Sequence, residues 1–312
     1  MNPSDASRTA LATSLMRAVH SRADPAPLLD DVWGDRLVPE SVRAAFRQPV
    51  LDRMDSDARA KSLASPESVL DRALRANAAY ADVIIRARYT EDALQEAVAQ
   101  GIDQYVIIGA GFDSFACRRP AYARKLNIFE VDHPATQTLK RQRLTECGVP
   151  ESDWLHFIAA DLSAEELQTA LARSSFQPTQ PTFFSWLGVT MYLTREANLA
   201  ALRAIASCAP NGSELVFTYV DDAVFGLAYS GTESFRKLKN EVSSSGEAFL
   251  SGFDPGAIRE QLQNVGLQLL EDLNGDQMVA RYDEAGANGL QSNAAAHIAH
   301  TRVLRALGPS AV

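Results

Sequence analysis

The amino-acid sequence predicts an α/β fold built on a mostly parallel β-sheet with helices on both faces. An apolar run at residues 105–108 ends in the Gly-Ala-Gly turn at 109–111, and a second apolar run at 126–132 ends in an acid. Strands that are apolar throughout are typical of sheets buried on both faces. From residue 103 onward such runs alternate with helical patterns, and this alternation indicates parallel pairing.

Length and composition predict a soluble globular protein. The chain has 312 residues, 46% of them hydrophobic and 22% charged, which favours one large domain with an appended cap. We expect an N-terminal helical cap at 1–100 and a ligand-binding core at 101–312, with a lid inserted near 221–250. The net charge of −9 argues against nucleic acid as a partner, because such binding depends on clustered Lys and Arg.

The expected location is the cytoplasm. No apolar run approaches the length that spans a bilayer, and the N-terminus lacks the basic and apolar segments of a signal peptide. Cys117, Cys147 and Cys208 are odd in number and lack metal-type spacing, so we expect reduced thiols and no metal site. The basic cluster at 140–143 is interpreted as a solvated helix face.

The sequence predicts that residues 1–100, before the core, are mainly helical. Asp5 or Ser7 can cap the first of them, and an irregular stretch rich in Asp follows at 28–38. A long helix is expected from Pro66 through Arg88, followed by a second helix at 91–100.

The core is expected to contain further strands at 155–159, 182–187, 214–220 and 267–270. Asp254 and Pro255 suit the start of a helix between the last two. Residues 277–282 alternate like a strand. The closing strand is expected at 297–304, antiparallel to its neighbours.

The strand ends carry the candidate ligand-binding residues. Gly109 and Gly111 lack a Cβ atom, so a ligand can approach the backbone there. Ser114 occupies the place of the third glycine of a dinucleotide fingerprint. Asp132 lies at the offset where nucleotide-binding α/β domains place a carboxylate on the ribose hydroxyls. Glu130 points to the same side of its strand and is the rival candidate.

Asp161 and Leu162 follow the third strand and could contact an adenine. The acid can accept the exocyclic amine, and the leucine can pack on the ring. Asp161 could instead cap the helix that Glu165 and Glu166 open. A capping box formed by Ser163 and Glu166 would leave Asp161 free for a ligand.

The segments VIIGAGFDS, FEVDHP, ADLS and FFSWLGVTMYLTREA together resemble the leucine carboxyl methyltransferase family. The resemblance runs from about Ser7 to about Arg305 and is closest to its bacterial O-methyltransferase branch. It implies a Rossmann-like class I methyltransferase sheet and S-adenosyl-L-methionine (SAM) as cofactor. It also implies methyl transfer to a carboxylate or hydroxyl oxygen of a small molecule, with some members acting in secondary metabolism.

The resemblance also implies roles for particular residues. Arg86 would hold the carboxylate of the methionine moiety, with Arg88 the alternative. The family carries a glutamate in the fourth-strand segment that touches the cofactor, and Leu187 occupies that position here. Trp186 and Tyr192 could line the substrate pocket, although core packing is favoured for Trp186. At 277–282 the family has a short helix instead of a strand.

No catalytic base is predicted. The methyl group of SAM is already activated, so the protein must align the acceptor and exclude water. A carboxylate acceptor needs no base, whereas a phenol or alcohol does. His133 follows the candidate ribose acid and is expected on the wrong side of the site, and His156 is interpreted as structural.

Two other functions stay open at the level of sequence. An NAD-dependent oxidoreductase would suit the acid after the second strand, although Ser114 and the 161–163 strand end disfavour it. A non-catalytic SAM-binding protein would suit Leu187.

Overall fold

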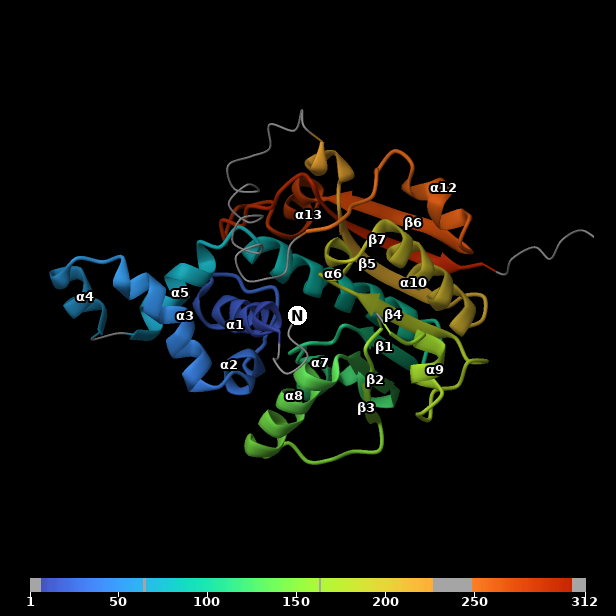
Figure 1. The fold of residues 1–312 in the computed structure, drawn as a ribbon, viewed down its shortest axis with the longest axis horizontal. Coiled ribbons are helices and arrows are strands. Elements are labelled where there is room, and N and C mark those ends of the chain that lie inside the picture. The colour runs from blue at the N-terminus through green and yellow to red at the C-terminus, as the bar shows by residue number, and fades with distance from the viewer. Residues whose placement is uncertain (1–6, 64–65, 163, 227–248, 305–312) are drawn as a thin grey trace, which may run out of the picture.

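The computed structural model describes residues 7–63, 66–162, 164–226 and 249–304 and contains one seven-stranded sheet (Figure 1). The strands are β1 (Gln104–Ile108), β2 (Asn127–Asp132), β3 (Leu155–Ala159), β4 (Thr182–Trp186), β5 (Glu214–Val220), β6 (Leu267–Asn274) and β7 (Ala296–Val303). Their order in the sheet is β3-β2-β1-β4-β5-β7-β6. Strands β1 to β5 pair in parallel, and β7 is antiparallel to both of its neighbours. The predicted fold class is confirmed.

The α-helices are α1 (Arg8–Ala23), α2 (Trp33–Leu37), α3 (Glu40–Asp52), α4 (Ser56–Leu63), α5 (Pro66–Arg75), α6 (Tyr80–Ala99), α7 (Phe115–Arg118), α8 (Pro134–Glu146), α9 (Leu167–Leu171), α10 (Arg195–Cys208), α12 (Ile258–Gln263) and α13 (Gly275–Tyr282). Three short 3₁₀ helices are η1 (Ala121–Lys125), η2 (Thr190–Tyr192) and η3 (Asp222–Phe225).

Two hydrophobic layers enclose the sheet, one on each face. Tyr105 and Ile107 of β1 pack in a cluster with residues of α1, α6 and α8. Val106 and Ile108 of the same strand pack in a second cluster with α9, α10 and α12. This alternation follows from the two-residue period of a strand, and it explains why residues 105–108 are all apolar.

The helix boundaries before the sheet differ from those predicted. The expected helix from Pro66 through Arg88 is interrupted at 76–79, and α6 then continues without a break to Ala99. Asn77 causes the interruption because its side-chain oxygen accepts from the Ala79 NH at 2.9 Å. Such a local bond competes with the helical pattern. The irregular stretch at 28–38 contains the short helix α2. Of the two candidate caps of α1, Ser7 accepts from Ala10 N at 3.1 Å.

The C-terminal region settles the choice between a strand and a helix. The strand pattern at 277–282 is wrong, because α13 forms there with a capping box between Asn274 and Gln277. The closing antiparallel strand is confirmed as β7. The sixth strand runs four residues beyond its expected end, to Asn274. Asp254 bonds the Gly256 NH within a turn, and α12 begins only at Ile258.

The predicted lid falls largely on residues 227–248, outside the described residues, and it stays a prediction, as does the domain boundary near residue 100. Helix α6, on the cap side of that boundary, packs against β4 and β5. None of the described helices has the length and apolar character needed to cross a membrane.

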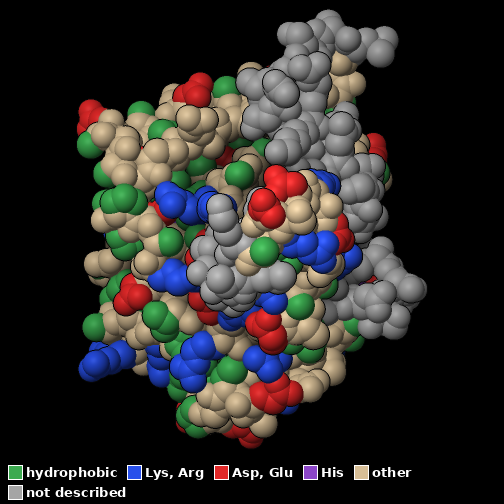
Figure 2. Space-filling view, turned by 90° about the vertical axis from the view of Figure 1, so that its left-hand side faces the viewer, with side chains coloured by type: hydrophobic (Ala, Val, Ile, Leu, Met, Phe, Trp, Pro, Cys, Tyr) green, Lys and Arg blue, Asp and Glu red, His purple; other side chains and the backbone are tan. Residues whose placement is uncertain are grey.

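Charged side chains on the face that carries α3 and α4 are interspersed in sign (Figure 2). Arg47 pairs with Glu40 at 3.1 Å, and Arg59 pairs with Asp52 at 3.5 Å. Charges on this face therefore compensate one another locally.

Candidate functional site

The predicted strand-end residues lie at one edge of the sheet. Gly109 follows β1, Asp132 ends β2 and Asp161 follows β3, and these strands are adjacent and parallel. The Gly109 NH donates to the Val131 carbonyl, and the Ala160 NH donates to the Asp132 carbonyl, both at 2.9 Å. The edge is therefore continuous at the carboxyl ends of the strands, where open α/β sheets bind ligands.

The glycine turn has a conformation that requires glycine. Gly109 has φ +67° and Gly111 has φ +52°. A Cβ atom would lie 2.7 Å from Val189 Cγ2 at the first position and 2.9 Å from Ala10 Cβ at the second. The turn is therefore held between the segment after β4 and helix α1.

Asp132 and the alternative candidate, Glu130, lie in different environments. Asp132 accepts hydrogen bonds from the Gly111 NH and, at 2.6 Å, from the His133 NH. Burial raises its pKa, and these two backbone donors oppose the rise. Glu130 lies deeper in the strand and forms a buried ion pair with Lys140 of α8. Asp132 alone of the two acids stands at the sheet edge.

The interpretation of residues 140–143 as a solvated face is wrong at its first residue. Lys140 is only 1% exposed because α8 turns it inward to Glu130. Burial raises the pKa of Glu130 to about 7, against the opposing effect of the Lys140 ammonium.

Asp161 and Leu162 lie in the turn after β3. The Asp161 carbonyl accepts from the NH groups of Ala164 and Glu165, both at 2.9 Å. Helix α9 begins only at Leu167, with Glu166 at its N-cap, so Asp161 does not cap it. The predicted capping box involves Ser163, which lies outside the described residues. Leu162 is 39% exposed, so its side chain is accessible beside the strand end.

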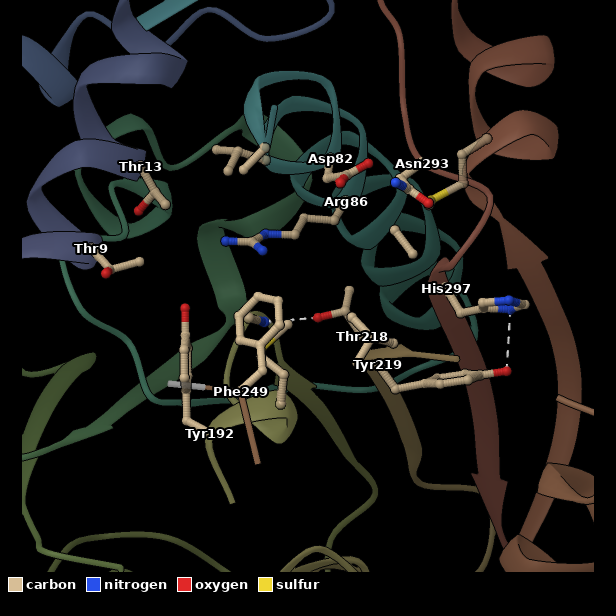
Figure 3. A pocket seen from close by; sticks show the side chains of 17 residues that line it. Thr9, Thr13, Asp82, Arg86, Tyr192, Thr218, Tyr219, Phe249, Asn293 and His297 are labelled. Carbon is tan, nitrogen blue, oxygen red and sulfur yellow. Dashed lines mark hydrogen bonds between the residues drawn. The ribbon is translucent and has the colours of Figure 1, made fainter. Parts of the chain in front are cut away.

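A cavity of about 100 Å³ lies at the ends of β4 and β5 (Figure 3). Helices α1 and α6, η2 and β7 complete its wall. Its lining residues are Thr9, Thr13, Ala79, Asp82, Val83, Arg86, Gly188, Met191, Tyr192, Thr218, Tyr219, Val220, Phe249, Met278, Asn293, Ala296 and His297. The wall is mainly apolar, with a few polar groups, as is typical of small-molecule sites.

Arg86 extends from α6 into this cavity, with its guanidinium toward Thr9, Thr13 and Tyr192 (Figure 3). A Cβ atom at Gly188 would lie 2.8–3.0 Å from the guanidinium, so the group lies against the end of β4. Among the described residues the guanidinium has no hydrogen bond or ion pair. Burial lowers its pKa, which is the effect expected for a desolvated cation. Arg88 instead binds Asp92 at 2.6 Å and lies outside the cavity.

Asp82 is a cavity residue that the sequence interpretation missed. Its Oδ1 atom accepts from the Ser292 hydroxyl. Burial raises the pKa of Asp82 to about 6, although Ser292 and Arg86 oppose the shift. The available sequence signal was its position one helical turn before Arg86.

The two candidate pocket residues occupy different places. Tyr192 lines the cavity and lies beside Phe249, with ring centroids 5.7 Å apart. Trp186 is 2% exposed in the cluster between the sheet and α9, α10 and α12. Its side chain is therefore a core residue and does not line the cavity.

The histidines offer no base that faces the cavity interior. The His297 ring stacks on Tyr219 and lies 3.3 Å from Asp272, and both rings point away from Arg86 (Figure 3). His133 accepts from Ala135 N at the start of α8. His156 stacks on Phe129 with ring centroids 4.7 Å apart. Both rings therefore make contacts within the fold and do not line the cavity.

A family model described as leucine carboxyl methyltransferase matches residues 10–206. A Bacillus subtilis protein named as an S-adenosyl-L-methionine-dependent methyltransferase, YktD, is 32% identical over 287 residues, covering 88% of this chain and 91% of its own. A similarly named protein from Parafrankia is 32% identical, covering 74% of this chain and 67% of its own.

Solved structures share the fold. A methyltransferase structure from Thermobifida fusca matches with a TM-score of 0.53 and 17% identity, covering 76% of this chain and 89% of that one. A DUF574 family protein from Streptomyces avermitilis matches with a TM-score of 0.52 and 17% identity, covering 71% and 83%. At this identity the likeness concerns the fold alone.

Proposed function

This chain belongs to the leucine carboxyl methyltransferase family and is a SAM-dependent methyltransferase, and we propose that it methylates an oxygen atom of a small molecule. The observation that carries the cofactor site is the position of Arg86, whose guanidinium, unpaired among the described residues, lies in a cavity at the end of β4. Membership of a methyltransferase family removes the reason to retain an NAD-dependent oxidoreductase.

The candidate cofactor residues suit SAM in their chemistry. Arg86 would hold the methionine carboxylate, because a guanidinium meets a carboxylate through two parallel hydrogen bonds. Gly109 and Gly111 would admit the nucleoside close to the backbone. Asp132 would accept the ribose hydroxyls, which are donors to an ionised carboxylate. Asp161 and Leu162 would contact the adenine.

The acceptor would occupy the apolar part of the cavity, beside Tyr192. When bound, SAM supplies an activated methyl group on a sulfonium. The protein's own residues would position the acceptor oxygen and exclude water. Because the His297 ring is stacked on Tyr219 and points away from Arg86 (Figure 3), this arrangement best suits an acceptor oxygen that is ionised at neutral pH. A carboxylate or an acidic hydroxyl meets that condition.

A transfer assay with tritium-labelled methyl groups tests the proposal. We expect label in carboxylic acids or phenols from a panel that also contains amines and thiols. Alkali releases the label from a methyl ester but not from a methyl ether, so it separates the two oxygen acceptors. Label only in amines or thiols would contradict an oxygen acceptor. An absence of transfer to the whole panel, with SAM binding intact, would favour a non-catalytic protein.

The matched control uses the neighbouring arginine on the same helix. Arg86→Gln removes the cavity cation, whereas Arg88→Gln removes one that pairs with Asp92 outside it. We expect SAM affinity to fall for the first variant only. If both substitutions changed SAM affinity equally, Arg86 would not be the residue that contacts the methionine carboxylate.

A further inference from the structure

Asp82 and Arg86 are separated by one turn of α6, yet they do not pair. Opposite charges at this spacing commonly interact on a helix surface. Here no ion pair within 4.0 Å joins them, because Arg86 reaches Gly188 and Asp82 binds Ser292. Among the described residues that line the cavity, Asp82 is the sole acid and Arg86 the sole lysine or arginine.

The cavity therefore presents one negative and one positive group, held apart in a mainly apolar wall. A charge in such surroundings is costly unless an opposite charge and hydrogen bonds compensate it. The α-amino acid end of SAM carries a carboxylate and an ammonium on the same carbon atom. A ligand of this kind compensates both protein charges at once.

We propose that Asp82 accepts a hydrogen bond from the α-ammonium group of SAM while Arg86 holds the α-carboxylate. This assignment rests on the proposed cofactor site. The Ser292 hydroxyl already donates to Oδ1 of Asp82, so Oδ2 is the atom that can accept from the ammonium. An ammonium is a donor of three hydrogen bonds and accepts none, so it needs an acceptor of this kind. Arg86 cannot serve, because it only donates.

Among the described residues of the wall no other side chain is a carboxylate, so none can supply the same counter-charge. Thr218 Oγ1 already accepts from the Gly188 NH at 2.7 Å. The imidazole of His297 and the hydroxyl of Tyr219 point away from Arg86 (Figure 3), and the Tyr219 hydroxyl donates to Asp272 at 2.7 Å. A neutral oxygen would also leave the ammonium without a counter-charge. Asp82 thus selects the zwitterionic form of the cofactor's amino acid end.

Binding calorimetry with three ligands tests this assignment. S-adenosylhomocysteine carries the full amino acid, its desamino analogue keeps only the carboxylate, and 5′-methylthioadenosine lacks both groups. We expect the native chain to bind S-adenosylhomocysteine at least about tenfold more tightly than the desamino analogue, as loss of a charge-assisted hydrogen bond implies. Asp82→Asn should remove this preference while leaving 5′-methylthioadenosine affinity within about twofold.

Asp92→Asn is the matched control, because Asp92 lies on the same helix but outside the cavity. It should keep the full preference. If Asp82→Asn fails to fold, the native chain still tests the assignment. Equal affinity of the native chain for S-adenosylhomocysteine and its desamino analogue would overturn it. Retention of the preference in folded Asp82→Asn would overturn it as well. Failure of the native chain to bind any of the three ligands would instead overturn the proposed cofactor site.

Discussion

Replacing Gly188 by alanine perturbs the position of the Arg86 guanidinium without changing any charge. The new Cβ atom would lie 2.8 Å from Nη1 and 2.9 Å from Nη2, closer than real Cβ atoms approach such groups. The guanidinium must therefore shift. If it held the cofactor carboxylate, the loss of hydrogen bonds to a charged group would cost about 1.5–3 kcal/mol. That corresponds to a rise of about ten- to hundredfold in the dissociation constant.

The substitution also strains the backbone, and this cost must be separated from the effect on Arg86. Gly188 has φ +69°, a conformation that costs an alanine about 1–2 kcal/mol. Gly212 provides the control: it has φ +87°, and among the described residues no atom lies within 4 Å of the place that a Cβ would take. Gly212→Ala should therefore lose similar stability and keep its cofactor affinity.

Thermal unfolding and calorimetry with S-adenosylhomocysteine measure the two effects on the same samples. We expect both variants to unfold at lower temperature and only Gly188→Ala to bind more weakly. If both variants bound S-adenosylhomocysteine as tightly as the native chain, the guanidinium would not be the group that holds the carboxylate.

Three further predictions concern buried ionisable groups. Burial lowers the pKa of His20, so the unfolded chain takes up a proton at a higher pH than the folded chain does. The contribution of neutral His20 to the free energy of unfolding should be fully present above about pH 6.5 and be lost as pH falls through the folded pKa. Melting curves should show a smaller loss of stability in acid for His20→Gln. Lys140→Met should lower the free energy of unfolding, measured by chemical denaturation, by about 3–5 kcal/mol, because it leaves the buried Glu130 without its partner. A double variant that also carries Glu130→Gln should recover most of this loss. Burial raises the pKa of Cys117 to about 12 and of Cys208 to about 11, so a thiol reagent at neutral pH should modify both slowly until denaturant is added. Rapid labelling at either of these two positions in the native chain, located by mass spectrometry, would contradict the prediction.

The sheet could be predicted because its buried strands are visible in the sequence as runs of apolar residues. In β1 each of residues 105–108 packs in one of two hydrophobic layers, so the run is apolar and its end is marked by glycines. The closing strand β7 was also found. The break at 76–79 could not be found in this way, because no proline or glycine marks it and a single side-chain bond of Asn77 decides it.

The candidate site was predictable only in part, for a geometric reason. Strand-end residues such as Asp132 lie at fixed offsets from a glycine turn, so spacing locates them. The choice between Arg86 and Arg88 depends on which face of α6 meets the sheet, and only packing decides that. The cavity joins segments as distant as Thr9 and His297, and no local pattern connects them.

Ser114 shows how a departure from a motif can carry structural information. Its hydroxyl donates to Asp31 at 2.6 Å, and the same carboxylate accepts from Arg17 at 2.8 Å. Burial alone would raise the pKa of Asp31, but Arg17 and Arg118 bring it below its ordinary value, so the ion pair is maintained inside the protein. Arg17 also donates to the Phe112 carbonyl at 2.7 Å, within the glycine turn.

These bonds join helix α1 and the segment before α2 to the glycine turn, where Ala10 leaves no room for a Cβ on Gly111. A glycine at position 114 could not supply the hydroxyl. The serine that weakens the dinucleotide fingerprint is therefore one of the residues through which the N-terminal segment holds the turn in place. Because Thr9 and Thr13 of that segment also line the cavity, the N-terminal helix is a wall of the proposed cofactor site, and its docking and the shape of the turn depend on the same buried carboxylate.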